Sequence, residues 1–337
     1  MRFIWVHRLI LNHLTIPHLP STSVPILAST NFSHSVCKKI ARFVIARTST
    51  QLPNNYYSNT GDLMEVILLG TGSPMPDAKR GGPATLVKAG ATQILVDAGR
   101  AVVMRLTGAG SLPIFLSGVL ITHLHSDHLT DLNDVITTHY IMSQAETPLH
   151  IYGPPRTQEV VNGILASLAP DISYRLAHHP DTLWWQPKII VTEVTPGMKF
   201  TIGEAQISVG ETNHAPVEPT VSYRIEHEGK SVVLGGDGIP CETLDAICKG
   251  ADAYVQTVIR AELVGLVKNK RFLDILDYHS TVEQAAQTAT RAGVKKLILT
   301  HYVPSIQPGQ EEEWRALAAA HFAGEIVLGD DLTATTI

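Results

Sequence analysis

Four potential metal ligands follow one apolar stretch of the chain within six residues. The stretch 122–128 reads THLHSDH and comes directly after the apolar residues 118–121. Imidazole and carboxylate groups together suit zinc first, and iron or manganese second. Burying so many polar groups without a bound ion would be costly. The motif therefore predicts a metal centre rather than a polar loop.

The local structure around this motif indicates which ligands share an ion. Residues 118–122 have the pattern of a buried strand, and in an extended chain residues i and i+2 lie on one side. His123 and His125 can therefore reach the same ion. The following residues are types that begin helices, so we expect Asp127 and His128 at a helix start, facing a second ion. A helix N-terminus also favours the ionised form of Asp127, which is the form that binds metal.

Three further potential ligands, His214, Asp237 and His301, each follow another predicted strand. Strand ends are where sheets of this kind gather their sites. With a bridging Asp237, the two ions have separate ligand sets: His123, His125 and His214 for the first, and Asp127, His128 and His301 for the second. Two ions about 3.5 to 4 Å apart can share a water, lower its pKa and stabilise charge on the attacked centre and the leaving oxygen. The seven ligands therefore predict a hydrolase with two zinc ions, which manganese or iron could replace.

Asp97 ends another predicted strand and precedes a glycine-containing turn. It could be a turn residue, or it could accept a hydrogen bond from a ligating imidazole. We favour the second role, because a neighbouring strand end delivers the ligands.

The N-terminal part of the chain differs in composition from the remainder. Residues 1–61 contain six Lys or Arg and no Asp or Glu, so with a whole-chain net charge of −5 the remainder carries −11. A body this acidic is poorly suited to holding a long polyanion through charge alone. Residues 1–63 show no sustained period and resemble a transit peptide, or they reflect a start site placed too far upstream. We therefore expect an N-terminal extension over 1–63 and a hydrolase domain over 64–337.

The composition also bears on location. No apolar segment reaches the roughly 18 residues that a membrane span needs. The three cysteines form no disulfide framework, which favours a reducing compartment. We expect a cytoplasmic protein, or an organellar or exported one if residues 1–63 are a targeting segment.

The predicted elements alternate between strands and helices. Strands are expected at 64–69, 84–88, 93–97, 118–122, 149–152, 188–194, 199–202, 205–209, 221–226, 231–234, 253–258, 296–300 and 325–329, the last of them. Helices are expected from about 127 and at 157–168, 241–249, 281–292 and 311–322. Residues 170–187 have no period and contain Trp184 and Trp185. We expect either an irregular lid or substrate wall, in which these two rings stack on an aryl group, or aromatic packing under a long loop.

The motif at 122–128 resembles the signature of the metallo-β-lactamase superfamily over essentially residues 64–337. The other candidate residues fall where that signature places them, namely Asp97, His214, Asp237 and His301. The resemblance implies an α/β fold of the αββα type, in which two mixed β-sheets pack back to back with helices outside, around a dinuclear zinc site.

Other motifs resemble the ribonuclease Z-like branch of this superfamily. They are GTGSP at 70–74, His279-Ser280-Thr281 and LTHY at 299–302. By that likeness His279 is a catalytic histidine rather than a ligand, so that Asp127 and His279 are the expected catalytic residues. The alternative for His279 is a residue beside a Ser280 helix cap.

The sequence also departs from ribonuclease Z. The strand at 251–259 lacks the glutamate that supports the catalytic histidine in that family, and only residues 215–236 separate His214 from Asp237. No Lys-rich arm for tRNA is evident. The motifs LNDVI at 132–136, YVQT at 254–257 and ILDYHS at 275–280 instead resemble arylsulfatase-type members.

These observations together lead to one expected function and two alternatives. We expect a dinuclear zinc hydrolase of small anionic esters, above all aryl sulfates, acting through a metal-bound hydroxide, with phosphodiesters as the second substrate class. The first alternative is a ribonuclease Z-like phosphodiesterase that processes tRNA 3′ ends. The second is a non-enzymatic, metal-stabilised binding module, against which the full ligand set argues. The expected partner is a small anionic ester, with nucleic acid less favoured, no membrane, and a homodimer as the assembly.

Overall fold

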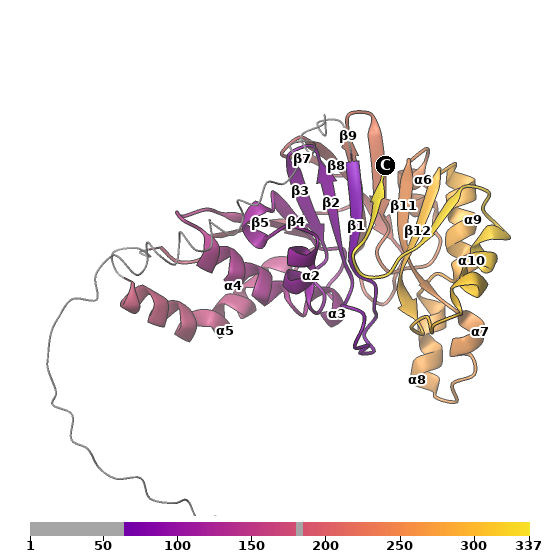
Figure 1. Ribbon diagram of the computed structural model, residues 1–337, viewed down its shortest axis with the longest axis horizontal. Coiled ribbons are helices and arrows are strands. Elements are labelled where there is room, and N and C mark those ends of the chain that lie inside the picture. The colour runs from indigo at the N-terminus through magenta and orange to yellow at the C-terminus, as the bar shows by residue number, and fades with distance from the viewer. Residues whose placement is uncertain (1–63, 180–184) are drawn as a thin grey trace, which may run out of the picture. The chain divides into compact units, whose positions relative to one another are not determined.

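The computed structural model describes residues 64–179 and 185–337. The predictions for residues 1–63 and for Trp184 therefore lie outside the described residues. Two seven-stranded β-sheets form the centre of the described chain (Figure 1). Among the described helices, none has the length and apolar composition that crossing a bilayer requires.

The first sheet has the strand order β14-β1-β2-β3-β4-β5-β6. Its strands are β1 (Met64–Gly70), β2 (Ala84–Ala89), β3 (Thr92–Val96), β4 (Gly118–Leu120), β5 (Leu149–Gly153), β6 (Ile189–Glu193) and β14 (Thr333–Thr336). Neighbours from β3 to β6 are parallel, whereas the other pairs are antiparallel.

The second sheet has the order β13-β12-β11-β10-β9-β8-β7. Its strands are β7 (Lys199–Ile202), β8 (Ala205–Thr212), β9 (Thr220–His227), β10 (Lys230–Leu234), β11 (Ala253–Ile259), β12 (Lys296–Val303) and β13 (Glu325–Leu328). Neighbours from β10 to β13 are parallel and the rest are antiparallel, so this sheet is mixed as well.

Helices cover the outer face of each sheet. The first sheet carries α2 (Val102–Gly108), α4 (Leu132–Met142) and α5 (Thr157–His178), and the second carries α6 (Glu242–Cys248), α9 (Val282–Ala292) and α10 (Glu311–Ala319). The shorter elements are α3 (Ser126–Leu129), α7 (Ala261–Val264), α8 (Lys270–Leu273) and the 3₁₀ turns η1 (Pro113–Phe115) and η2 (Asp274–Asp277).

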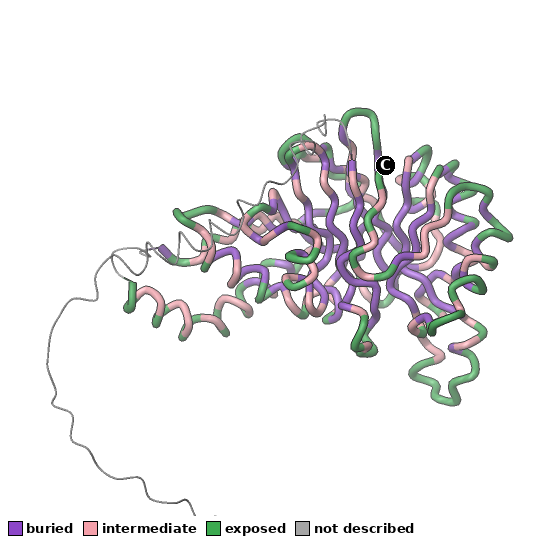
Figure 2. Tube along the Cα trace, in the orientation of Figure 1, coloured by how far each residue is buried: buried purple, intermediate pink, exposed green. Residues whose placement is uncertain are grey.

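The strands are apolar on both faces because both faces are covered. Successive side chains of a strand point to opposite faces. On β1, Leu68 belongs to the core between the sheets, and the next residue, Leu69, belongs to the core under the helices. Figure 2 shows the resulting band of buried strands. The four layers confirm the predicted αββα sandwich with two mixed sheets.

One predicted helix is longer than expected. The sequence analysis places this helix at 157–168 and an aperiodic segment after it, and Pro170, which lacks a backbone N–H, lies just beyond that predicted end. The structure instead continues α5 through Pro170 to His178. Asp171 and Arg175 form an ion pair of 2.7 Å one turn beyond the proline, which supports the continuation. The expected irregular segment at 170–187 is therefore wrong over its first nine residues.

Three boundaries also differ from the prediction. The helix expected after residue 127 is two helices, α3 and α4, separated at Thr130–Asp131. The cap of α9 is Thr281 rather than Ser280, since the Thr281 side chain accepts from the Gln284 backbone and the Gln284 side chain reaches back. A further strand, β14, follows the strand predicted to be the last and pairs with β1.

Candidate metal centre

The structure brings together all seven side chains that the sequence singles out as metal ligands. They form two groups, in each of which the potential ligand atoms lie within 4.8 Å of one another. The first group is His123, His125, His214 and Asp237, and the second is Asp127, His128 and His301. These groups correspond to the two predicted ligand sets, although their role as ligands stays a prediction.

Ring nitrogens converge on one point in the first group. Nδ1 of His125 lies 3.0 Å from Nε2 of His123 and 3.2 Å from Nε2 of His214. Around a tetrahedral zinc with Zn–N bonds of about 2.0 to 2.1 Å, neighbouring donor atoms are about 3.3 Å apart. The spacing of these nitrogens therefore fits a zinc ion.

The second group combines one carboxylate with two imidazoles. Oδ2 of Asp127 lies 3.2 Å from Nε2 of His301 and 3.7 Å from Nε2 of His128. His301 has a positive φ of 52°, which is rare for a residue with a side chain. A backbone held in this region at a functional position is a common way of aiming a side chain.

Asp237 lies between the two groups. Its Oδ2 is 3.8 Å from Nε2 of His123, 3.4 Å from Nε2 of His128 and 3.5 Å from Nε2 of His301. Both Oδ1 of Asp237 and Nε2 of His128 are buried without a hydrogen-bond partner among the described residues. Because unsatisfied buried polar atoms are costly, their convergence fits a site built for cations, with Asp237 in a bridging position.

Asp97 fixes the orientation of one imidazole. Its Oδ2 accepts a hydrogen bond of 2.8 Å from Nδ1 of His128, and its Oδ1 accepts one of 2.8 Å from the backbone N–H of Thr122. With the proton on Nδ1, Nε2 of His128 is left to face the centre. Asp97 thus has the favoured of its two expected roles. The sequence analysis did not identify Thr122 as a partner of Asp97. The only signal that could have pointed to it is its place directly before His123.

The buried position of the histidines keeps two of them neutral. Burial lowers the pKa of His214 to about 4 and that of His123 well below its ordinary value. Neutral imidazole is the form that binds a metal. Burial would raise the pKa of Asp237, but the facing His301 and His128 hold it well below the usual range, so this carboxylate is ionised.

His279 lies beside the centre and outside both ligand groups. Its Nδ1 donates a 3.0 Å hydrogen bond to the carbonyl of Ile275, and its Nε2 lies 3.3 Å from Oδ2 of Asp237. The carbonyl of Tyr278, the residue directly before His279, accepts a 2.8 Å hydrogen bond from Nδ1 of His214. Sequence reasoning missed both carbonyls, because backbone contacts leave no trace in residue type.

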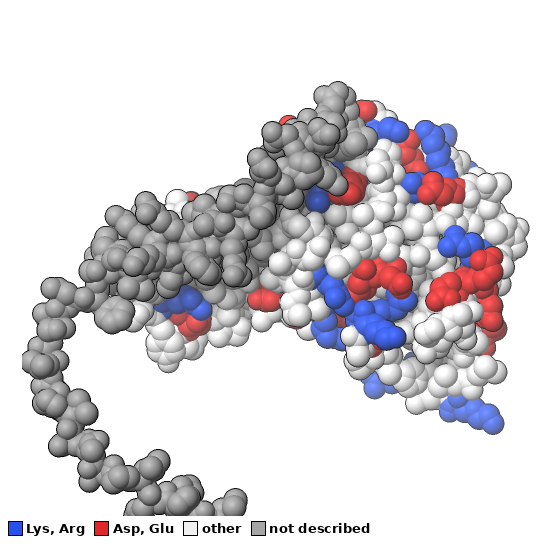
Figure 3. Space-filling view, in the orientation of Figure 1, with Lys and Arg blue, Asp and Glu red and all other residues white. Residues whose placement is uncertain are grey.

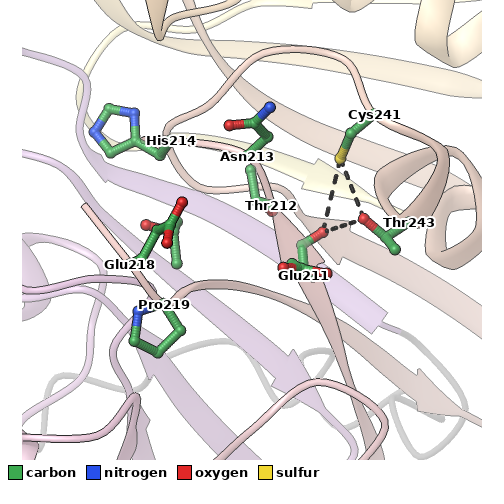
Figure 4. A pocket seen from close by; sticks show the side chains of 9 residues that line it. Glu211, Thr212, Asn213, His214, Glu218, Pro219, Cys241 and Thr243 are labelled. Atoms are coloured by element: carbon green, nitrogen blue, oxygen red, sulfur yellow. Dashed lines mark hydrogen bonds between the residues drawn. The ribbon is translucent and has the colours of Figure 1, made fainter. Parts of the chain in front are cut away.

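A pocket of about 610 Å³ opens next to the first ligand group. It is lined by Glu211, Thr212, Asn213, His214, Glu218, Pro219, Thr220, Cys241 and Thr243. Figure 4 shows His214 and Glu218 on one side of this pocket and Cys241 and Thr243 on the other. The pocket gives a substrate access to His214. Trp185, a predicted substrate-stacking residue, is only 8% exposed and does not line it.

Comparison with known proteins gives consistent results. A model of the β-lactamase superfamily domain matches residues 92–302. The chain is 54% identical over 272 residues to a ribonuclease Z of Mycolicibacterium gilvum (strain PYR-GCK), which covers 80% of this chain and 95% of that protein. It is 52% identical to a ribonuclease Z of Mycobacterium bovis (strain BCG / Pasteur 1173P2), covering 80% of this chain and 97% of the relative.

Solved structures share the fold at lower identity. The metallo-β-lactamase fold protein YhfI from Bacillus subtilis has a TM-score of 0.63 at 22% identity and covers 82% of this chain and all of its own. The short form of human tRNase Z has a TM-score of 0.58 at 21% identity, covering 80% of this chain and 98% of that one.

The expectation of an aryl sulfate hydrolase is wrong. The relatives with more than half of their residues identical are ribonucleases Z. The expectation relied partly on a missing glutamate partner for His279, but the structure supplies the carbonyl of Ile275 in that role. The missing side chain therefore does not leave His279 without support.

Proposed function

The chain belongs to the metallo-β-lactamase superfamily and to its ribonuclease Z branch, and from this premise we propose that it is an endonuclease that removes the 3′ trailer of precursor tRNA. It is a metal-dependent hydrolase of phosphoric esters. The observation that supports the finer proposal is the identity of 52 to 54% to ribonucleases Z over most of the chain. The centre is compatible with it, because Oδ2 of Asp237 lies within 3.8 Å of histidines from both ligand groups. A phosphodiester that binds there lies next to candidate ligands that follow strands of both sheets.

The residues present fit two metal ions, which we propose are zinc. His123, His125 and His214 would hold the first, Asp127, His128 and His301 the second, and Asp237 would contact both. When bound, such ions activate water and stabilise the charge that develops on phosphorus oxygens.

The remaining chemistry falls to side chains of the chain itself. The ionised carboxylate of Asp127 is placed to accept a proton from the attacking water. His279 is held through Nδ1 by the Ile275 carbonyl, so its Nε2 faces the centre and can donate a hydrogen bond or a proton toward the leaving oxygen. Asp97 keeps Nε2 of His128 directed at the centre. The pocket of about 610 Å³ beside His214 gives room for the strand to be cut.

The test compares three substrates with the purified full chain and added zinc. They are a precursor tRNA with a 3′ trailer, an aryl phosphodiester and an aryl sulfate. We expect cleavage of the precursor at the trailer, slower turnover of the aryl phosphodiester and none of the sulfate. Asp127→Ala should abolish both activities, whereas Asp134→Ala, on the exposed face of α4, should abolish neither. A wild-type chain that leaves precursor tRNA intact at low salt would refute the proposal.

We also propose that the chain is a homodimer. Sedimentation equilibrium of the zinc-loaded protein should give twice the 36.6 kDa of one chain. A single species at the monomer mass across micromolar concentrations would contradict this expectation.

A further inference from the structure

A lobe between β11 and α9 lies beside the metal centre. We define the lobe as residues 260–278, which include α7, α8 and η2. Figure 1 shows it projecting from the same edge of the sandwich at which α3 lies. Since α3 carries Asp127 and His128, the lobe lies at the same edge as these two candidate ligands.

The tip of the lobe is positively charged. Residues 266–272 read LVKNKRF and contain no acidic side chain. Lys270 pairs with Asp274 at 2.8 Å, whereas Lys268 and Arg271 have no ion-pair partner in the part of the chain that the structure describes. Figure 3 shows Lys or Arg side chains at the free end of the lobe. On a body of net charge −11 over residues 62–337, this tip is a local site for an anion.

Exposed apolar side chains flank these cations. Leu266 is 75% exposed, Val267 42% and Phe272 40%. A partly exposed aromatic ring beside two cations without ion-pair partners combines a stacking surface for a base with partners for the adjacent phosphates. A cationic segment flanked by apolar side chains over seven residues thus matches an unpaired RNA segment better than a purely apolar partner.

The base of the lobe holds two histidines of the centre. The carbonyl of Ile275 accepts from Nδ1 of His279 at 3.0 Å, and the carbonyl of Tyr278 accepts from Nδ1 of His214 at 2.8 Å. The Tyr278 ring also packs edge-on against His214, with centroids 5.2 Å apart. The lobe is therefore anchored beside the centre at its base, while its tip is free to contact a substrate.

We propose that the lobe is the RNA-contacting element of this enzyme: Lys268 and Arg271 bind phosphates, and Phe272 stacks on an unpaired base near the cleavage site. This inference rests on the proposed function. The acidic body is poorly suited to binding a long polyanion, and the inference assigns that binding to the lobe.

The experiment measures kcat and KM for precursor tRNA and for an aryl phosphodiester, with the full-length, zinc-loaded chain at several salt concentrations. The test variant is Lys268→Ala/Arg271→Ala. The matched control is Lys199→Ala/Lys249→Ala, which removes the same charge from two exposed positions outside the lobe. A third variant, Phe272→Ala, tests the stacking surface without a change of charge.

For the test variant we expect the KM for precursor tRNA to rise about tenfold and the slope of log KM against log salt to fall by about 1.5, since two phosphate contacts are lost. The ratio of kcat/KM for precursor tRNA to that for the aryl ester should fall in parallel. Phe272→Ala should lower that ratio about fivefold or more. The control variant should resemble the wild type.

Two outcomes would overturn the inference and can be told apart. If the wild type cleaves precursor tRNA but the test variant has an unchanged KM and salt slope, or the control falls equally, the lobe is not the RNA contact while the proposed function stands. If the wild type hydrolyses only the aryl ester, the proposed function fails and the lobe assignment fails with it.

Discussion

Replacing Asp97 by Asn would test how the second ligand group is built. The carboxylate accepts two hydrogen bonds of 2.8 Å, one from the Thr122 backbone and one from Nδ1 of His128. An asparagine of nearly the same shape has one oxygen and one NH₂ group, so it can accept from only one of these two donors. Asn also tolerates the positive φ of 61° at this position, so the backbone need not move.

Either orientation of the new amide weakens metal binding. If its NH₂ group faces His128, the imidazole must move its proton to Nε2, the nitrogen that faces the centre. If its NH₂ group faces Thr122, a buried backbone donor loses its partner and the ligand loop shifts. Loss of such a supporting contact typically costs 10- to 100-fold in metal affinity, which is about 1.4 to 2.7 kcal/mol.

Zinc affinity can be measured by competition with a chromogenic chelator, and zinc content by mass spectrometry after dialysis against buffered zinc. We expect Asp97→Asn to bind one ion 10- to 100-fold more weakly while its circular dichroism stays native. The matched control, Asp134→Asn on the exposed face of α4, should bind zinc like the wild type. Wild-type affinity for both ions in Asp97→Asn would refute the reasoning.

Three further substitutions test a catalytic histidine, a candidate ligand and a helix cap. His279→Ala should keep its zinc while kcat for an aryl phosphodiester falls about 10²- to 10⁴-fold, because a proton donor is lost but no ligand; a loss of zinc would instead make His279 a ligand. His301→Ala should retain mainly the first of the two ions and lose turnover, which zinc analysis and kinetics of one sample can check, and full zinc content would contradict the ligand assignment. Thr281→Ala should lower the free energy of unfolding in urea by about 1 kcal/mol, because it removes the cap that pairs with Gln284 at the start of α9. An unchanged urea midpoint would show that this cap contributes nothing.

The convergence of the seven candidate ligands could be predicted from the sequence because its information is local. Each of His214, Asp237 and His301 comes at or just beyond the end of an apolar run, and a buried run of that length is recognisable as a strand without knowing its neighbours. Parallel strands in one sheet then bring their ends to a common edge. The αββα architecture was predicted instead from the resemblance of the motif at 122–128 to the metallo-β-lactamase signature.

Features that depend on distant parts of the chain could not be predicted. The continuation of α5 past Pro170 and the pairing of β14 with β1 depend on packing that no short window contains. The same holds for the support of His279, where the sequence lacks the expected carboxylate and the structure provides the Ile275 carbonyl. Reading that absence as a change of substrate led to the wrong preference for aryl sulfates.

The charges of the centre limit what it can bind by itself. With neutral water at the centre, two divalent ions would bring four positive charges to a site where Asp97, Asp127 and Asp237 bring three negative ones, which leaves an excess of one for a phosphodiester of equal and opposite charge. Screening confines that attraction to about 8 Å at physiological salt, and the surrounding body is acidic. The centre can therefore hold the phosphate that reaches it but not the rest of a long RNA. If Lys268 and Arg271 hold the rest, changes at the lobe should act mainly on KM and changes at the centre mainly on kcat.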